Sequence, residues 1–121
     1  MSKILIVDDS EIVRNQIVAA ITSAGYEIVT AVDGRDGVNQ FNANPDVNLV
    51  ISDINMPNLS GLEMIEEIRK HEKGKDVLIF VLTTEASPEL KTRGKDLGVK
   101  GWIVKPFNPA NLLAGVKKML G

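Results

Sequence analysis

The sequence contains no cysteine among its 121 residues. Disulfide bonds, thiol nucleophiles and cysteine-ligated zinc sites are therefore excluded. Histidine occurs once, as His71 in a charged run that ends at Asp76, and this setting favours a solvated helix end over a ligand or a catalytic base. Because a hydrolytic triad needs a histidine beside its nucleophile, the sequence argues against that class of enzyme.

The sequence also lacks a charge excess and any long apolar run. Its 14 basic and 16 acidic residues nearly balance, so there is no electrostatic footprint for nucleic acid. The apolar run before Asp8 is far too short for a signal peptide, and no run approaches the length of a membrane span. The glycine-rich loops that bind nucleotides are absent. We expect a soluble, cytoplasmic protein that inserts into no membrane.

The length and the hydrophobic content of the chain are sufficient for one folded domain. A length of 121 residues suits a single domain over 1–121, and 44% hydrophobic residues can fill its core. We find no repeat, no low-complexity tract and no linker. Only Gly121 follows the last predicted helix, so we expect a stand-alone domain.

Strand and helix patterns alternate from end to end. Strands are predicted over residues 3–7, 27–31, 49–51, 77–82 and 102–104. Helix starts are indicated by Asp9 or Ser10, by Ser60 with Glu63, by Ser87-Pro88 and by Asn108-Pro109. Alternation of this kind predicts an α/β fold of (βα)5 type, with a doubly wound, flavodoxin-like parallel sheet in the strand order 2-1-3-4-5.

Polar residues follow four of these strands where each strand ends. They are Asp8, Asp9, Asp53, Thr83 and Lys105. Because the carboxyl ends of parallel strands share one edge, we expect all of them to gather there. Strands one and three are neighbours in the predicted order, so the three acids should meet at the topological switch point.

Three carboxylates in one small space repel each other unless a cation neutralises them. An oxygen-only set of ligands suits Mg²⁺, and a carboxylate beside Mg²⁺ can accept a phosphoryl group. Lys105 can add positive charge and Thr83 a hydroxyl. We also hypothesise a cis Lys105–Pro106 bond, which would direct the lysine over the site.

Each residue also has a simpler interpretation. The Asp8-Asp9 pair can cap a helix and interact with its dipole, Thr83 can bond to backbone, and Lys105 can be a surface cation. The combination of all five at matching strand ends favours phosphoryl chemistry.

These motifs resemble the receiver domain of two-component response regulators over essentially the whole chain. The matching residues are Asp8-Asp9, Asp53 with Met56-Pro57 and Gly61, Thr83, and Lys105-Pro106-Phe107. The resemblance implies that Asp53 accepts a phosphoryl group from a phosphohistidine on a sensor kinase, with Mg²⁺ bound. It implies that Asp9 binds the metal directly, Asp8 binds it through water, and Asn55 offers its backbone carbonyl.

The resemblance also implies a switch. Lys105 would pair with the phosphoryl group, and Thr83 would bond to it and report phosphorylation. Trp102 stands where the family carries a switch aromatic, more often Tyr or Phe, and it is bulkier and lacks the hydroxyl.

Within the family, the chain is most similar to the stand-alone CheY-like chemotaxis receivers. Asn55, Glu85 and the segments 85–88 and 101–107 carry this similarity. It implies a CheA-like sensor histidine kinase, a FliM-like flagellar motor switch protein as target, and a monomer before phosphorylation. The output surface would be the fourth helix, the fifth strand and the fifth helix. The fourth helix, predicted over 89–97, has few apolar residues, as suits a two-state surface.

Two alternatives stay open at this point. A phosphorelay intermediate would use the same chemistry and pass the group to a histidine phosphotransferase. A small Mg²⁺ phosphatase of haloacid dehalogenase type would also use an aspartate nucleophile, but its D-x-D motif is replaced here by Asp53-Ile54-Asn55. We therefore expect no enzyme in the ordinary sense, only a protein that catalyses its own phosphorylation and slow dephosphorylation.

Overall fold

A five-stranded parallel sheet forms the centre of the molecule. The structure, a computed structural model, describes residues 2–121. The strands are β1 (Lys3–Val7), β2 (Glu27–Ala31), β3 (Leu49–Ser52), β4 (Leu78–Thr83) and β5 (Gly101–Val104). Every pairing is parallel and the strand order is β2-β1-β3-β4-β5. The predicted doubly wound fold is confirmed.

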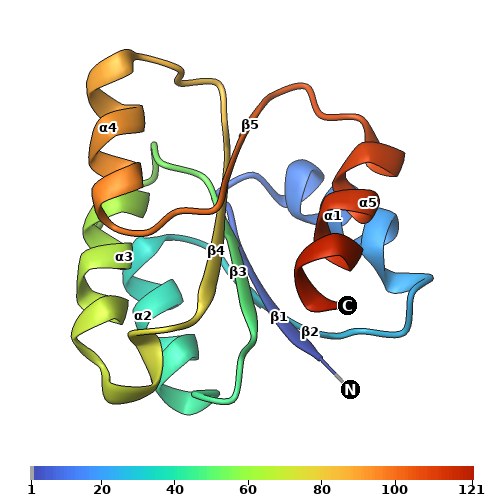
Figure 1. Ribbon diagram of the computed structural model, residues 1–121, viewed down its shortest axis with the longest axis horizontal. Helices are drawn as coiled ribbons and strands as arrows, with labels where there is room; N and C mark the ends of the chain where they lie inside the picture. The colour runs from blue at the N-terminus through green and yellow to red at the C-terminus, as the bar shows by residue number, and fades with distance from the viewer. Residues whose placement is uncertain (1) are drawn as a thin grey trace.

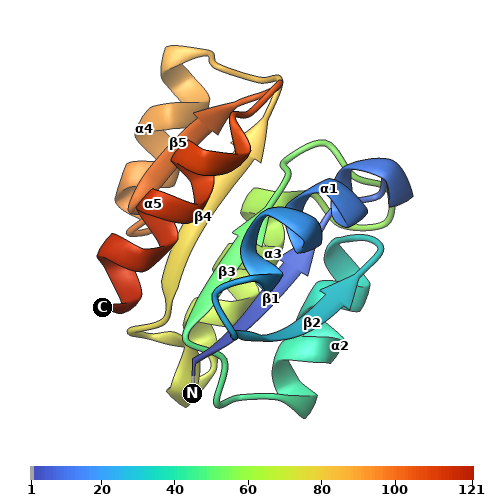
Figure 2. The ribbon, with the colours of Figure 1, turned by 90° about the vertical axis from the view of Figure 1, so that its right-hand side faces the viewer.

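Helices cover both faces of this sheet. They are α1 (Glu11–Thr22), α2 (Gly34–Ala43), α3 (Gly61–Lys70), α4 (Pro88–Asp96) and α5 (Pro109–Leu120), with a short 3-10 turn, η1 (Glu72–Gly74). The helices α1 and α5 lie on one side, and α2, α3 and α4 lie on the other (Figures 1 and 2). Within residues 2–121, no helix has the length and apolar character needed to cross a membrane.

The hydrophobic core is divided by the sheet into two layers. Successive residues of a strand point to opposite faces, so Ile4 and Ile6 of β1 join the layer under α1 and α5. Leu5 and Val7 join the layer under α2 and α3. All four side chains are at most 1% exposed, which explains why this strand is apolar at each position from Ile4 to Val7.

The predicted helix caps are confirmed, with small differences at element ends. Ser10 is the residue that caps α1, and Ser60 and Glu63 form the full capping box of α3. The helix α4 begins at Pro88, the proline predicted for its first helical position, and ends at Asp96, one residue before the predicted end. The strand β4 extends to Thr83, because Thr83 pairs with Val104 of β5.

Gly61 allows α3 to approach the end of β3 closely. Its N–H donates to the carbonyl of Ile54 at 2.8 Å. A Cβ at this position would lie 1.9 Å from the carbonyl oxygen of Asp53, which is backbone and cannot rotate away. The absence of a side chain at Gly61 therefore fixes the segment that begins with Asp53.

We predict that Gly61→Ala lowers the free energy of unfolding by about 1–3 kcal/mol, because the added methyl group overpacks this contact. The matched control is Gly115→Ala in α5, where a new Cβ would meet only Phe80 at an ordinary 3.7 Å. That variant should gain about 0.5–1 kcal/mol, since Ala is the better helix former. Urea unfolding of both variants measures the difference, and equal effects would contradict the steric explanation.

Candidate functional site

Three carboxylates meet at the carboxyl edge of the sheet. Asp8 and Asp9 follow β1, and Asp53 follows the neighbouring strand β3. One oxygen from each lies within 4.8 Å of the others. Asp8 and Asp53 are buried, at 1% and 8% exposure, whereas Asp9 is exposed. The predicted convergence of the three acids is confirmed, and the cluster is able to bind a metal ion.

Lys105 joins two of these acids. It follows β5, and its peptide bond to Pro106 is cis, as hypothesised. Its Nζ donates to Asp8 Oδ2 at 2.9 Å and to Asp53 Oδ2 at 2.8 Å. The lysine side chain thus spans β4 to reach the acids beside β1 and β3.

Burial and charge act in opposite directions in this cluster. Burial raises the pKa of Asp8, although the Ser10 N–H and the Lys105 ammonium both favour its charged form. Burial alone would lower the pKa of Lys105, but its bonds to Asp53 and Asp8 outweigh that effect and the pKa is raised. Lys105 is therefore protonated at neutral pH, and its one ammonium contacts two carboxyl groups, those of Asp8 and Asp53.

Backbone and side-chain bonds hold the two acid-bearing loops in place. Asp8 Oδ1 accepts from the Ser10 N–H at 2.9 Å, and Asp53 Oδ1 accepts from the Ile54 N–H at 2.6 Å. Arg14 Nη1 donates to the carbonyl of Asp8 at 2.6 Å. Sequence reasoning did not predict this role of Arg14. In the sequence, only the position of Arg14 in the first turns of the helix after Asp8 indicated that its side chain could reach this loop.

Glu85 connects the other predicted site residues. Its N–H donates to the hydroxyl of Thr83 at 3.2 Å, and its carbonyl accepts from Trp102 Nε1 at 2.9 Å. Its carboxylate accepts from Asn55 Nδ2 at 2.8 Å. Thr83 is fully buried, and among the hydrogen bonds of residues 2–121 its hydroxyl has none to Asp53.

The ring of Trp102 is partly buried and packs against α4. A Cβ at Gly94 would lie 2.9 Å from Cζ3 of this ring, so the small residue makes room for the large one. Trp102 therefore contacts both the loop that carries Glu85 and the body of α4.

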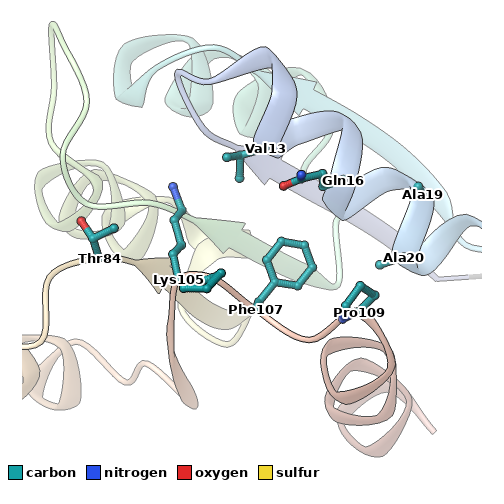
Figure 3. Close-up of a pocket in the computed structure, with 9 residues that line it drawn as sticks. Val13, Gln16, Ala19, Ala20, Thr84, Lys105, Phe107 and Pro109 are labelled. Atoms are coloured by element: carbon teal, nitrogen blue, oxygen red, sulfur yellow. The ribbon is translucent and has the colours of Figure 1, made fainter.

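An open groove of about 700 Å³ lies beside the acid cluster. Its walls come from Val13 and Gln16 of α1 and from Phe107 and Pro109 on the way into α5. Figure 3 shows Lys105 between Thr84 and Phe107, with its ammonium pointing away from Phe107. Lys105 therefore contacts both the acid cluster and this groove.

A polar bridge joins the loop after β3 to the loop after β2. Asn58 Nδ2 donates to Asp33 Oδ2 at 2.7 Å, and the Asp36 N–H donates to Asp33 Oδ1 at 2.8 Å. These bonds, that from Asp36 first, lower the pKa of Asp33 below its usual 3.8.

Comparison with known proteins agrees with this geometry. The family profile of the response regulator receiver domain matches residues 4–117. The chain belongs to this family. It is 39% identical to chemotaxis protein CheY of Treponema pallidum over 120 residues, which cover 98% of this chain and 82% of that protein.

Solved structures of response regulators are also similar to this chain. Chemotaxis protein CheY4 of Vibrio cholerae is 41% identical, with a TM-score of 0.91 and 98% of each chain covered. Response regulator TrrA of Thermotoga maritima, solved in complex with Mg²⁺-BeF, is 36% identical, with a TM-score of 0.85, and the match covers 98% of this chain and 99% of that one.

We predict that Lys105→Ala lowers the free energy of unfolding of the metal-free receiver by about 1–3 kcal/mol, because two buried carboxylates lose their cation. Added Mg²⁺ should stabilise this variant more than the wild type, since no ammonium competes with the metal. Urea unfolding with and without Mg²⁺ measures both effects. The exposed Lys118→Ala serves as control, and equal Mg²⁺ stabilisation in all three proteins would contradict the prediction.

The lowered pKa of Asp33 predicts a pH dependence. The stability that its charged form contributes is present above pH 3.8, its usual pKa, and is lost as pH falls through the lower folded value. The difference in unfolding free energy between wild type and Asp33→Asn should therefore shrink on acidification. Urea unfolding at several pH values tests this, and a constant difference would count against it.

Proposed function

We propose that this chain is the receiver of a phosphorylation-activated response regulator, active in the cytoplasm and monomeric before phosphorylation. Asp53 accepts a phosphoryl group from the phosphohistidine of a CheA-like sensor histidine kinase, with Mg²⁺ bound. The observation that carries this proposal is the contact of the Lys105 ammonium with Asp53 and Asp8, at the edge where parallel sheets bind ligands.

The acid cluster fits Mg²⁺ by its chemistry. All of the available donors are oxygens, and the three carboxylates lie within 4.8 Å. Asp9 and Asp53 would bind the ion directly, Asp8 through water, and Asn55 through its backbone carbonyl. When bound, Mg²⁺ supplies positive charge to the oxygens of the transferred group. The Mg²⁺-BeF complex of the Thermotoga relative supports this choice of metal.

In the transfer step, a carboxylate oxygen of Asp53 forms a bond to phosphorus while the bond from phosphorus to the donor imidazole breaks. The imidazole leaves with the electron pair and takes a proton from solvent. The Ile54 N–H holds Oδ1 of Asp53, while Oδ2 faces Lys105. The ammonium is therefore positioned to move from the carboxylate to a phosphoryl oxygen.

The switch would begin at Thr83. Its hydroxyl now accepts from the Glu85 N–H, and its side chain would have to turn away from that partner to donate to a phosphoryl oxygen on Asp53. Exchange of this partner would release the loop after β4, which also holds Trp102. The surface of α4, β5 and α5 would change with it. The similarity to chemotaxis proteins supports a FliM-like flagellar motor switch protein as the target.

A phosphorelay intermediate that passes the group to a histidine phosphotransferase uses the same residues and is the second candidate. The phosphatase alternative is disfavoured by Asn55, whose amide donates to Glu85 and cannot serve as an acid or base. One transfer per molecule, followed by slow hydrolysis, is the expected chemistry.

The test combines mass and fluorescence. Acetyl phosphate with Mg²⁺ should add one phosphoryl group to the wild type and none to Asp53→Asn, and Trp102 emission should change only in the wild type. Thr83→Ala should be phosphorylated with most of its Trp102 response lost, because the hydroxyl links the two sites. Intact mass and emission are read on the same samples.

A phosphoryl group on Asp53→Asn would contradict the assigned acceptor. A full Trp102 response in Thr83→Ala would contradict the assigned switch. Pull-down of the phosphorylated protein with a motor switch protein or with a histidine phosphotransferase then separates the two outputs.

A further inference from the structure

The helix α4 has little apolar attachment to the rest of the molecule. Gly94 is its one buried residue, and Leu90 is partly buried against the core. Within residues 2–121, the backbone of α4 lies less close to the other helices and strands than that of α1, α2 or α5 does. Apart from Leu90 and the ring of Trp102 at Gly94, its position therefore depends strongly on polar contacts at its two ends.

The C-terminal end of α4 is held by Arg69, the residue before the last of α3. Its Nε donates to the carbonyl of Leu97 at 2.9 Å, and its Nη2 approaches that of Gly98 at 3.4 Å. Its Nη1 donates to the carbonyls of Gly74 and Val77 at 2.9 and 2.7 Å, and to that of Lys75 at 3.3 Å. One guanidinium thus joins the end of α4 to the connection between α3 and β4.

The lack of a side chain at Gly98 leaves room for the Arg69 guanidinium. Gly98 has a φ of +81°, a conformation that favours glycine, and a Cβ there would lie 3.2 Å from Arg69 Nη2. The positive charge of Arg69 also lies where the unpaired carbonyls of a helix C-terminus point. The planar fork of Arg can bond to several of these carbonyls at once, which a lysine cannot do.

The N-terminal end of α4 is attached differently. The loop before it is held by Trp102, through the Glu85 carbonyl, and by Asn55, through the Glu85 carboxylate. Both contacts connect this loop to the acid site, because Glu85 also donates its N–H to Thr83 and Asn55 follows Asp53 by two residues. An exposed ion pair between Arg93 and Glu66 adds a contact along the side of the helix, and exposed pairs of this kind contribute little.

We propose that Arg69 makes the C-terminal end of α4 a fixed pivot, so that changes at the acid site move its N-terminal end and the loop before it. Arg69 is a positioning residue, since it acts on α4 through backbone carbonyls and touches none of the three acids. The trigger rests on the proposed phosphorylation of Asp53, but the pivot can be tested without it.

The first test measures amide hydrogen exchange in the unphosphorylated protein. In Arg69→Gln, the amides of residues 97–99 should exchange about tenfold faster than in the wild type, because the carbonyls around them lose their donor. Arg93→Gln, which breaks only the exposed pair, should leave them unchanged. Unchanged exchange at 97–99 in Arg69→Gln would overturn the proposal, and so would a uniform increase across the whole sheet.

Two further variants keep this test decisive if Arg69→Gln does not fold. Arg69→Lys retains the charge without the fork, and Gly98→Ala perturbs the same contact from the side of α4. Both should accelerate exchange at 97–99. Full protection in Arg69→Lys would mean that charge alone is sufficient, which contradicts a pivot built on several carbonyl bonds.

The second test adds beryllofluoride and Mg²⁺ as a phosphoryl mimic. In the wild type, the change in exchange should be confined to residues 84–91 and be absent at 97–99, whereas in Arg69→Lys it should extend to 97–99. An equal change at both ends of the wild-type helix would overturn the pivot. No change anywhere would contradict the proposed switch, and the first test would still decide the pivot.

Discussion

The contact of one ammonium with two buried carboxylates organises the functional edge of this receiver. Asp8 and Asp53 lie on neighbouring strands and would repel each other without a cation. Lys105 supplies that charge from a third strand, and its own burial is offset by the bonds that it makes. The same ammonium can bind an incoming anionic group, so in the proposed function the contact that balances the resting site would also stabilise a phosphoryl group.

The acid site communicates with the surface through a short chain of contacts. Thr83, Glu85 and Trp102 are joined by hydrogen bonds, and Trp102 packs on Gly94. The stronger attachment of α4 is at its opposite end, where Arg69 binds backbone carbonyls. A helix that is firm at one end and connected to the site at the other has a defined direction of motion, which a uniformly loose helix lacks.

The sequence predicted the fold and the acid cluster well, for physical reasons. The core strands are apolar on both faces and bounded by polar residues, so β1 and the acids after it are visible as a pattern. Parallel topology then requires those acids to meet. The element ends were less well predicted, because Thr83 belongs to β4 through its pairing with β5.

The contacts that were missed depend on distance through space. Arg14 and Arg69 donate to backbone carbonyls, and a carbonyl is present at every position of the chain. No spacing or composition therefore marks its partner. The central role of Glu85 was also hidden, because two of its three bonds use main-chain atoms.

The order of strands in the sheet determines when the site can form during synthesis of the chain. Asp8 and Lys105 are 97 positions apart, so their contact is one of the last that a growing chain can form. Until β5 has left the ribosome and joined the sheet, the acids beside β1 and β3 have no ammonium between them. A nascent or truncated chain thus contains Asp8 and Asp53 without their cation, and the charge balance of the site is reached only when the whole domain has been made.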